Sequence, residues 1–377
     1  MKFAHISDSH LSFRQFGLLE REYDFYDVFD KVIDSIIKEK PDFVIHSGDF
    51  FESSRPSPLA LLSAQMALSR LKNNDIPIFA IAGNHDIVMR SDAIPPQMLF
   101  EDLGLTLLDP SDPYIFDDKI FIGGIQYYSR HFNKLLLKSL ENLENKAKDY
   151  DKKILVLHQG IDRYLNINYE LKMGQIPKNF NYYAFGHIHK RIIEDFGEGK
   201  LAYPGCPEIW RMDEIENYET KGKGYYMVDI SRDSPEIKLI DIESPRAIIQ
   251  RTIDYSNFDK EIDNLKEEVD DCAEKPLLKL KIVGDGFKSS DIHPLINEIF
   301  NKNCLSTRIQ CQPNIINEKL KTADNKHHNI QELLKEGLDY YKEDYSEFAL
   351  ELLNSISKND LETAESLTKK LYGDFKC

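Results

Sequence analysis

Five short segments of the sequence carry side chains that bind divalent metal ions, and an apolar run precedes each segment. Their donors are carboxylate and amide oxygens and imidazole nitrogens, which suit manganese, zinc and iron. In chain order these candidate ligands are Asp8, His10, Asp49, Asn84, His158, His187 and His189. Only two of the seven are anionic, so two divalent ions would leave net positive charge for an anionic substrate. Two ions about 3.5–4 Å apart can activate a shared water and stabilise attacking and leaving oxygens. We therefore predict a two-metal phosphodiesterase centre.

A histidine next to one of these ligands is the candidate for proton transfer. His85 follows Asn84 directly and precedes Asp86. A carboxylate beside an imidazole fixes the tautomer of the ring and raises its pKa. We therefore expect His85, supported by Asp86, to protonate the leaving alkoxide or to stabilise its charge.

The segments that must position these residues alternate between strand-like and helix-like patterns. Strand-like apolar runs occupy residues 2–6, 42–46, 77–82, 153–157 and 182–185, and helix periodicity is clear at 23–37. This alternation predicts an α/β fold with a largely parallel sheet, whose strand ends gather ligands at one edge. Glycines beside Asp49, Asn84 and His187 permit the sharp turns that such a cluster needs. Later runs at 224–230 and 237–242 lack intervening helices, so we expect part of the sheet to be antiparallel.

The chain divides into several predicted units. Residues 1–244 form the metal-binding domain, and 245–311 alternate strand and helix patterns as a small α+β domain. Residues 312–328 are polar and poorly periodic, which indicates a linker. Residues 329–377 contain amphipathic helix patterns whose apolar stripes have no evident place in the first two domains.

Composition narrows the class of protein. No run of about 18 apolar residues is present, so we expect no membrane span. The five scattered cysteines indicate reduced thiols and a cytoplasmic protein. The net charge of −16 is unusual for a protein that holds nucleic acid by bulk electrostatics. Binding to DNA would therefore need local cationic patches, the metal ions or a partner.

The order of the ligand motifs resembles one known family. The series D-x-H, G-D, G-N-H-D, H and G-H-x-H is similar to that of the calcineurin-like metallophosphoesterases. Over the whole chain the closer resemblance is to the Mre-eleven DNA repair nucleases, relatives of bacterial SbcD. The segments that carry it are HISDSHLSFRQ, HSGDFFESSRPSP, AGNHD, LHQGI and FGHIHKR.

This resemblance implies a two-sheet β-sandwich flanked by helices, with a small α+β capping domain and a C-terminal helical segment. It implies one ion on Asp8, His10, Asp49 and His189 and another on Asp49, Asn84, His158 and His187, most often manganese, with His85 as the catalytic histidine. The implied activity is 3′-to-5′ exonuclease and single-strand endonuclease action in DNA double-strand-break repair. The implied partners are DNA, a second copy of the chain, and a Rad-Fifty coiled-coil ATPase docked on residues 329–377. The resemblance further implies a protein associated with the nucleoid.

Contacts to the DNA backbone are the least constrained part of the site. The loops after the ligand strands carry Arg14, Arg55, Lys190 and Arg191, and a guanidinium can grip a phosphate with two hydrogen bonds. Solvated surface charge is an equally good explanation for all four. Many members of the resembled family have histidine three residues after the bridging aspartate, whereas this chain has Glu52.

Two further functions remain open on the sequence. The acidic composition favours a small phosphodiester or phosphomonoester as the substrate, while the additional domains oppose it. The amphipathic C-terminal helices favour a scaffold that mainly holds the ATPase on DNA ends. His5 and His46 lie inside strand patterns, where we expect them to support the site or the core.

Overall fold

The computed structural model describes residues 1–87, 94–232 and 234–313, and eight positions between 351 and 368. Most of the predicted linker at 312–328 and most of the predicted helical segment at 329–377 lie outside the described residues. Among the described residues, no helix has the length and apolar content needed to cross a bilayer.

The first of two six-stranded sheets contains the N-terminal strand. Its order is β12-β11-β1-β2-β3-β4. The pairs β1–β2, β2–β3 and β3–β4 are parallel, whereas β11 pairs antiparallel with β1 and with β12. This mixture agrees with the predicted parallel start and antiparallel end. The strands are β1 (Lys2–Ile6), β2 (Phe43–His46), β3 (Ile78–Ala80), β4 (Leu105–Leu107), β11 (Gly224–Asp229) and β12 (Glu236–Asp241).

The second sheet has the order β5-β6-β7-β8-β10-β9. Its four inner strands run parallel, and the edge strands β5 and β9 pair antiparallel with their neighbours. The strands are β5 (Tyr114–Phe116), β6 (Ile120–Ile125), β7 (Lys152–His158), β8 (Tyr182–Gly186), β9 (Ile192–Phe196) and β10 (Gly199–Tyr203).

The inner faces of the two sheets share one apolar core. Phe3, Phe43 and Ile45 from the first sheet belong to the same buried cluster as Ile154 and Val156 from the second. Both faces of these strands are buried, which explains why their sequences are continuous apolar runs instead of alternating ones. The predicted two-sheet sandwich is therefore confirmed.

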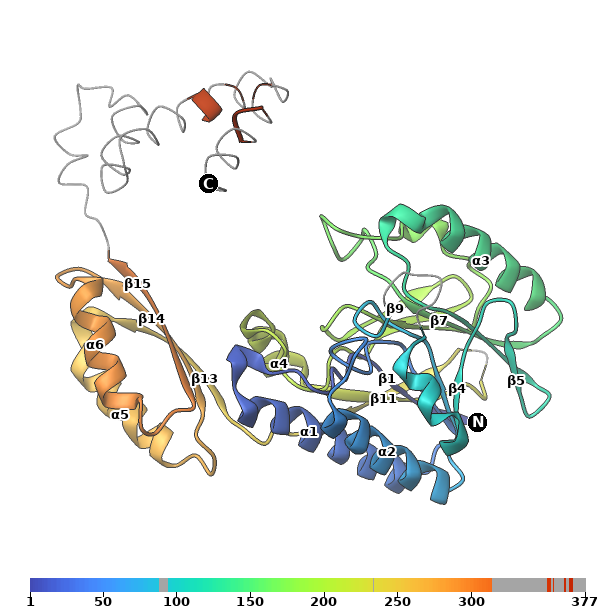
Figure 1. Ribbon diagram of the computed structural model, residues 1–377, viewed down its shortest axis with the longest axis horizontal. Coiled ribbons are helices and arrows are strands. Elements are labelled where there is room, and N and C mark those ends of the chain that lie inside the picture. The colour runs from blue at the N-terminus through green and yellow to red at the C-terminus, as the bar shows by residue number, and fades with distance from the viewer. Residues whose placement is uncertain are drawn as a thin grey trace. The chain divides into compact units, whose positions relative to one another are not determined.

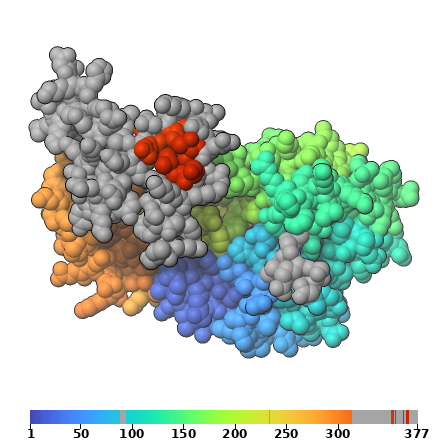
Figure 2. Space-filling view, turned by 45° about the horizontal axis from the view of Figure 1, so that its top comes forward, coloured from blue at the N-terminus to red at the C-terminus, as the bar shows by residue number. Residues whose placement is uncertain are grey.

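Helices cover the outer faces of the sandwich. The predicted apolar face of α1 (Leu19–Glu39) packs with α2 (Pro58–Asn73) in a core cluster that includes Val44 of the first sheet. On the opposite side, α3 (Asn133–Lys146) buries Leu136, Leu140 and Leu143 in a cluster with the second sheet. Figure 1 shows α1 and α2 on one side of the sheets and α3 on the other. Figure 2 shows the blue surface of α1 and α2 and the green surface on the α3 side.

A three-stranded sheet follows in the chain. Its order is β13-β14-β15, and its strands are β13 (Ile248–Asp254), β14 (Leu277–Gly284) and β15 (Ser306–Pro313). The helices α5 (Phe258–Asp270) and α6 (Ser289–Phe300) separate these strands, in the predicted α+β order. The predicted domain limits at 244 and 311 stay predictions.

Short helices complete the described elements. They are α4 (Ile215–Lys221) and the 3-10 turns η1 (Gln15–Gly17), η2 (Pro96–Leu103), η3 (Arg130–Phe132), η4 (Met173–Gln175), η5 (Met212–Glu214) and η6 (Tyr255–Asn257). The segment from η5 to α4 matters for function, because it follows directly on the loop that carries Trp210 and Arg211.

Candidate metal centre

All seven predicted ligands lie at the carboxyl ends of parallel strands from both sheets. Asp8 and His10 follow β1, Asp49 follows β2, and Asn84 follows β3. On the second sheet, His158 ends β7 and two further ligands, His187 and His189, follow β8. The two sheets therefore bring ligands from five separate segments to one end of the sandwich.

The backbone at four of these residues lies in the left-handed region. The φ angles are 54° at Asp8, 45° at His10, 52° at Asp49 and 87° at His187. Non-glycine residues rarely adopt such angles, which cost about 1–2 kcal/mol each and gather at functional sites. Loops optimised for stability alone would avoid this concentration of strain, so it indicates a functional site.

Glycines next to the ligands permit the close approach that the sequence predicted. A Cβ atom on Gly83 would lie 2.1 Å from Oδ1 of Asp49. A Cβ on Gly48 would lie 2.4 Å from Nδ1 of His158, and one on Gly186 would lie 2.2 Å from the carbonyl oxygen of Ser47. Any side chain at these positions would displace a ligand or its support.

One group of ligands is formed by Asp8, His10 and His189. The Nε2 atoms of His10 and His189 are 3.2 Å apart. Oδ1 of Asp8 lies 3.8 Å from Nε2 of His189, and Oδ2 of Asp49 lies 3.8 Å from Nε2 of His10. These donors surround one point in space, as the ligands of a single ion do.

A second group is centred on His158, whose Nε2 lies 3.2 Å from Oδ2 of Asp49 and 3.1 Å from Oδ1 of Asn84. Oδ1 of Asn84 is also 2.9 Å from Nδ1 of His187. Asp49 reaches both groups, and Asp8 does so as well, because its Oδ1 lies 4.0 Å from Nε2 of His158. The geometry is thus compatible with two neighbouring cations and a shared carboxylate.

Hydrogen bonds from Nδ1 fix the orientation of three of the imidazole rings. Nδ1 of His10 donates to Oε2 of Glu52 at 2.8 Å, and Nδ1 of His189 donates to Oε1 of Glu214 at 3.0 Å. Nδ1 of His158 donates to the carbonyl oxygen of Ser47 at 2.8 Å. Because Nδ1 of each ring is engaged in this way, Nε2 is the atom that faces the cluster.

This donor set fits divalent cations. The Nε2 atoms of His10 and His189 face each other, and that of His158 faces oxygens of Asp49 and Asn84. Burial alone would lower the pKa of His158, but the charge and hydrogen bond of Asp49 and the charge of Asp8 raise it to about 9. The same negative field that attracts a proton there attracts a metal ion. Burial and the charge of His158 lower the pKa of His187 to about 4, which keeps that ring neutral and free to coordinate.

His85 lies at the edge of this cluster and is partly exposed. Its backbone N–H donates to Oδ1 of Asp49 at 2.8 Å, and its Nδ1 donates to the carbonyl oxygen of Glu52 at 3.0 Å. Within the described residues no hydrogen bond engages its Nε2, so that atom is available to a substrate.

The expected contact between Asp86 and the His85 ring is not formed. The carboxylate of Asp86 is buried and accepts the backbone N–H groups of Phe50 (3.1 Å), Phe51 (2.9 Å) and Gly83 (2.9 Å). Asp86 therefore ties the loop after β2 to the loop after β3. Burial and the charge of Asp49 raise the pKa of Asp86 to about 6.

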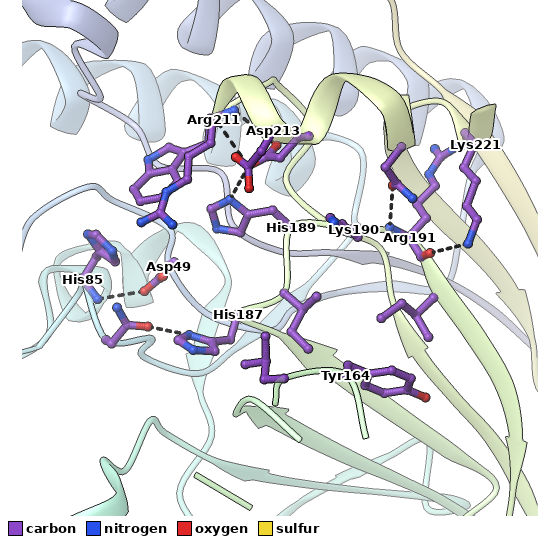
Figure 3. Close-up of a pocket in the computed structure, with 17 residues that line it drawn as sticks. Asp49, His85, Tyr164, His187, His189, Lys190, Arg191, Arg211, Asp213 and Lys221 are labelled. Carbon is purple, nitrogen blue, oxygen red and sulfur yellow. Dashed lines mark hydrogen bonds and ion pairs between the residues drawn. The ribbon is translucent and has the colours of Figure 1, made fainter. Parts of the chain in front are cut away.

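A cavity of about 550 Å³ opens beside the cluster (Figure 3). Asp49, His85 and His187 line it together with Lys190 and Arg211. Figure 3 shows the labelled His85 and Asp49 on the same side of this cavity as Arg211. Four of the seven candidate ligands, Asp49, Asn84, His187 and His189, line this cavity, so a substrate much larger than water can reach this side of the cluster.

The four cations expected to contact DNA differ in their surroundings. Arg191 is buried, and its guanidinium donates to Asp241 and to the carbonyl oxygens of Lys221 (2.7 Å) and Ile240 (2.8 Å). These bonds hold the guanidinium of Arg191 against neighbouring backbone, and the residue also lines the cavity, so its expected contact with DNA stays a prediction. Arg14 is exposed but paired with Glu22. Arg55 is exposed, and Lys190 is exposed and lines the cavity.

Sequence reasoning missed a cation that is better placed. Arg211 is exposed and lines the cavity, and its guanidinium carbon lies 4.5 Å from the centre of the Trp210 ring. The Trp210 ring in turn stacks on His10, with 5.3 Å between ring centres and 25° between planes. Trp210 is the single tryptophan of the chain. Its presence next to Arg211 was the one feature of the sequence that could have pointed to this cation.

Glu214 and Lys223 were also missed. Nζ of Lys223 donates to Oε2 of Glu214 at 2.7 Å, and both side chains are buried. Burial alone would raise the pKa of Glu214, but Lys223 and His189 lower it to about 2. His5 and His46 have the expected supporting positions, since His5 bonds Tyr182 and Ser47 and His46 bonds Ser9, each at 2.9 Å.

Comparison with known proteins agrees with this geometry. Residues 1–191 match the family model of the calcineurin-like phosphoesterases. The fold and the clustered ligands thus define a metal-dependent phosphodiesterase. The chain belongs to the Mre11 family within the calcineurin-like phosphoesterases.

Three relatives support this assignment. The chain is 41% identical over 286 residues to the DNA double-strand break repair protein Mre11 of Methanocaldococcus jannaschii, covering 75% of this chain and 76% of that protein. It is 33% identical over 392 residues to the protein of the same name from Saccharolobus solfataricus, covering 99% of each. For that of Thermoplasma acidophilum the identity is 32% over 382 residues, covering 98% of each.

Proposed function

We propose that this protein is a manganese-dependent nuclease of DNA double-strand-break repair, acting as 3′-to-5′ exonuclease and single-strand endonuclease. The observation that carries the proposal is the clustering of the seven candidate ligands beside a cavity that His85 lines. The printed names of the relatives support DNA repair as the process.

The proposed ligand division is Asp8, His10, Asp49 and His189 for one ion and Asp49, Asn84, His158 and His187 for the other. When bound, two divalent ions supply positive charge and activation of water for attack on phosphorus. Oxygen and imidazole donors of this kind accept Mn²⁺.

The protein's own contribution to bond cleavage centres on His85. Because Nδ1 of His85 donates to the carbonyl oxygen of Glu52, Nε2 is the atom directed at the substrate. In its protonated form the ring passes the Nε2 proton to the leaving oxygen, or stabilises the charge that develops there. Asp49 accepts the backbone N–H of His85, so the carboxylate that would hold both ions also positions the acid.

The net charge of −16 repels DNA, and cations near the metal centre offset this repulsion locally. Lys190 and Arg211 line the cavity, and Arg211 has no carboxylate partner among the described residues. We assign phosphate contacts to these two residues, and to Arg55, which is exposed and does not line the cavity. The ions and the ATPase partner supply further attraction.

The deciding experiment is a nuclease assay on DNA with defined ends. Purified protein is incubated with blunt, 3′-recessed and single-stranded circular DNA in Mn²⁺, Mg²⁺ or chelator, with and without the coiled-coil ATPase. We expect nucleotide release from ends and nicking of the circle with Mn²⁺, and neither with Mg²⁺ or chelator. Intact DNA of every form in Mn²⁺ would refute the nuclease assignment.

A small phosphodiester or phosphomonoester is the alternative substrate, and the acidic pI of about 5.2 favours it. Competition between DNA and a chromogenic diester separates the two. If DNA lowers the rate of diester cleavage at concentrations near its own KM, both use one site and DNA is the better ligand. A diester that is cleaved equally fast in saturating DNA favours the alternative.

The proposed binding of the ATPase, and the related scaffold function, concern residues that lie largely outside the described part of the chain. Deleting residues 328–377 should abolish co-purification with the ATPase while leaving diester cleavage intact. Retained co-purification would place the contact elsewhere.

We propose homodimerisation through α2 because it exposes apolar side chains. Leu62 is 50% exposed and Met66 is 59% exposed on this helix. In the second candidate segment, α3, Leu135 is 50% exposed. Sedimentation of a Leu62→Glu, Met66→Glu variant should give a monomer, and a Leu135→Glu variant should remain dimeric. The reverse result would assign the interface to α3.

A further inference from the structure

The carboxylate of Glu52 receives hydrogen bonds from two rings of the candidate site. Its Oε2 accepts Nδ1–H of His10 at 2.8 Å and Nε1–H of Trp210 at 3.3 Å. Its Oε1 lies 3.5 Å from Nδ1 of His85, which already donates to the backbone oxygen of the same residue. One residue thus contacts a metal ligand, the candidate acid and the indole that packs on both.

Glu52 and Glu214 each accept a hydrogen bond from a histidine of the first group of ligands. They differ in whether a nearby cation neutralises their charge. Glu214, behind His189, is paired with the buried ammonium of Lys223. Glu52, behind His10, has no lysine or arginine partner among the described residues, and its side chain is 23% exposed. A carboxylate whose charge is not compensated makes a hydrogen-bonded imidazole a stronger donor to a cation.

The second group of ligands does not depend on Glu52. His158 is oriented by the backbone oxygen of Ser47, and a substitution at position 52 leaves that oxygen in place. His187 contacts the side-chain oxygen of Asn84, on the loop after β3. Any effect of Glu52 on metal binding should therefore fall on one group of ligands.

We propose that Glu52 is a positioning residue that sets the affinity of the ion held by Asp8, His10 and His189 and leaves the other ion unaffected. It does so by fixing His10 with its Nε2 toward the cluster and by supplying negative charge behind it. The same carboxylate fixes Trp210, which stacks on His10 and carries Arg211 on its ring. The inference rests on the two-ion site of the proposed function and goes beyond it, because it makes the two ions unequal.

The test measures metal binding directly. Metal-free full-length protein is titrated with Mn²⁺ by calorimetry, as wild type, Glu52→Gln and Glu52→Ala. Glutamine keeps the shape and an acceptor for Trp210 but removes the charge, and alanine removes both. Glu236→Gln is the matched control, because Glu236 is 68% exposed on β12.

We expect two binding events in wild type and in the control. Glu52→Ala should weaken one of them by about 10–100-fold, the usual effect of losing such a support, and leave the other unchanged. Glu52→Gln should weaken the same event by a smaller factor. Tryptophan emission, which comes from Trp210 alone, should shift in Glu52→Ala and not in Glu52→Gln. Equal weakening of both events, or wild-type affinity in both variants, overturns the proposal.

The outcome does not depend on the DNA assay. If Glu52→Ala does not fold, the glutamine variant decides by itself, because it fills the same volume. Selective loss of one ion in a protein that leaves all DNA intact would refute the proposed nuclease function and support the role of Glu52. Nuclease activity with equal weakening of both ions would do the opposite.

Discussion

The Nε2 atoms of His10 and His189 face each other at 3.2 Å, and the Nδ1 atom of each ring donates to a carboxylate. Both Nε2 atoms therefore face the space that a shared cation would occupy. The carboxylates of Asp8 and Asp49 lie 3.8 Å from Nε2 of His189 and of His10, so a cation placed between the rings is attracted by negative charge as well as by nitrogen donors.

Metal removal should therefore destabilise the protein. With Mn²⁺ at one hundred times its Kd, a single ion adds about 2.7 kcal/mol to the free energy of unfolding, provided that the unfolded chain does not bind it. Urea unfolding followed by circular dichroism, with Mn²⁺ or with chelator, measures the difference. In Asp8→Asn, which removes a charge from the cluster, the difference should shrink. Equal midpoints with and without metal would contradict the site.

Replacing His85 by glutamine should separate metal binding from turnover. The ring donates its Nδ1–H to a backbone oxygen and is absent from the proposed ligand sets, so both ions should still bind. Turnover should fall by about 10²–10⁴, the usual contribution of a positioned acid or base. The comparison is with His131→Gln, at an exposed position in η3. Reduced metal stoichiometry in His85→Gln would instead make His85 a ligand.

Arg211→Gln should weaken DNA binding with little change in kcat for a small diester. A hydrogen bond to a charged group contributes about 1.5–3 kcal/mol, which corresponds to about 10–100-fold in KM. The dependence of log K on log salt should also become shallower, by about 0.7–0.9 for each lost phosphate contact. Arg232→Gln, with a side chain that is 77% exposed, is the matched control. An unchanged salt slope would remove Arg211 from the DNA surface.

Lys223→Met should destabilise the fold because it leaves the carboxylate of Glu214 buried without its partner. Breaking one side of a buried pair costs about 3–5 kcal/mol. Adding Glu214→Gln should restore much of the free energy of unfolding, since no buried charge is then left. Metal affinity should stay reduced in the double variant, because His189 has lost its carboxylate. Full stability of Lys223→Met would show that Glu214 finds another partner.

Much of the site could be predicted because its information is local. Asp8, Asp49 and His187 each stand within a few residues of a strand end, and the ends of parallel strands meet in space. The glycines beside them mark turns that a Cβ would block. The prediction that Asp86 contacts the ring of His85 was wrong. Residues that are adjacent within a turn can direct their side chains apart, so adjacency in the sequence does not imply contact.

The sequence by itself determined several of the sandwich's strands, its first helix, the seven candidate ligands and the candidate acid, because apolar periodicity and strand-end motifs are properties of short segments. Only the tertiary structure decided which carboxylates stand behind which histidines, that Arg191 is buried, and that Arg211 lines the cavity. Those relationships join residues such as Glu52 and Trp210 that are 158 positions apart. They depend on where the fold directs each side chain, and no pattern within one segment encodes that direction.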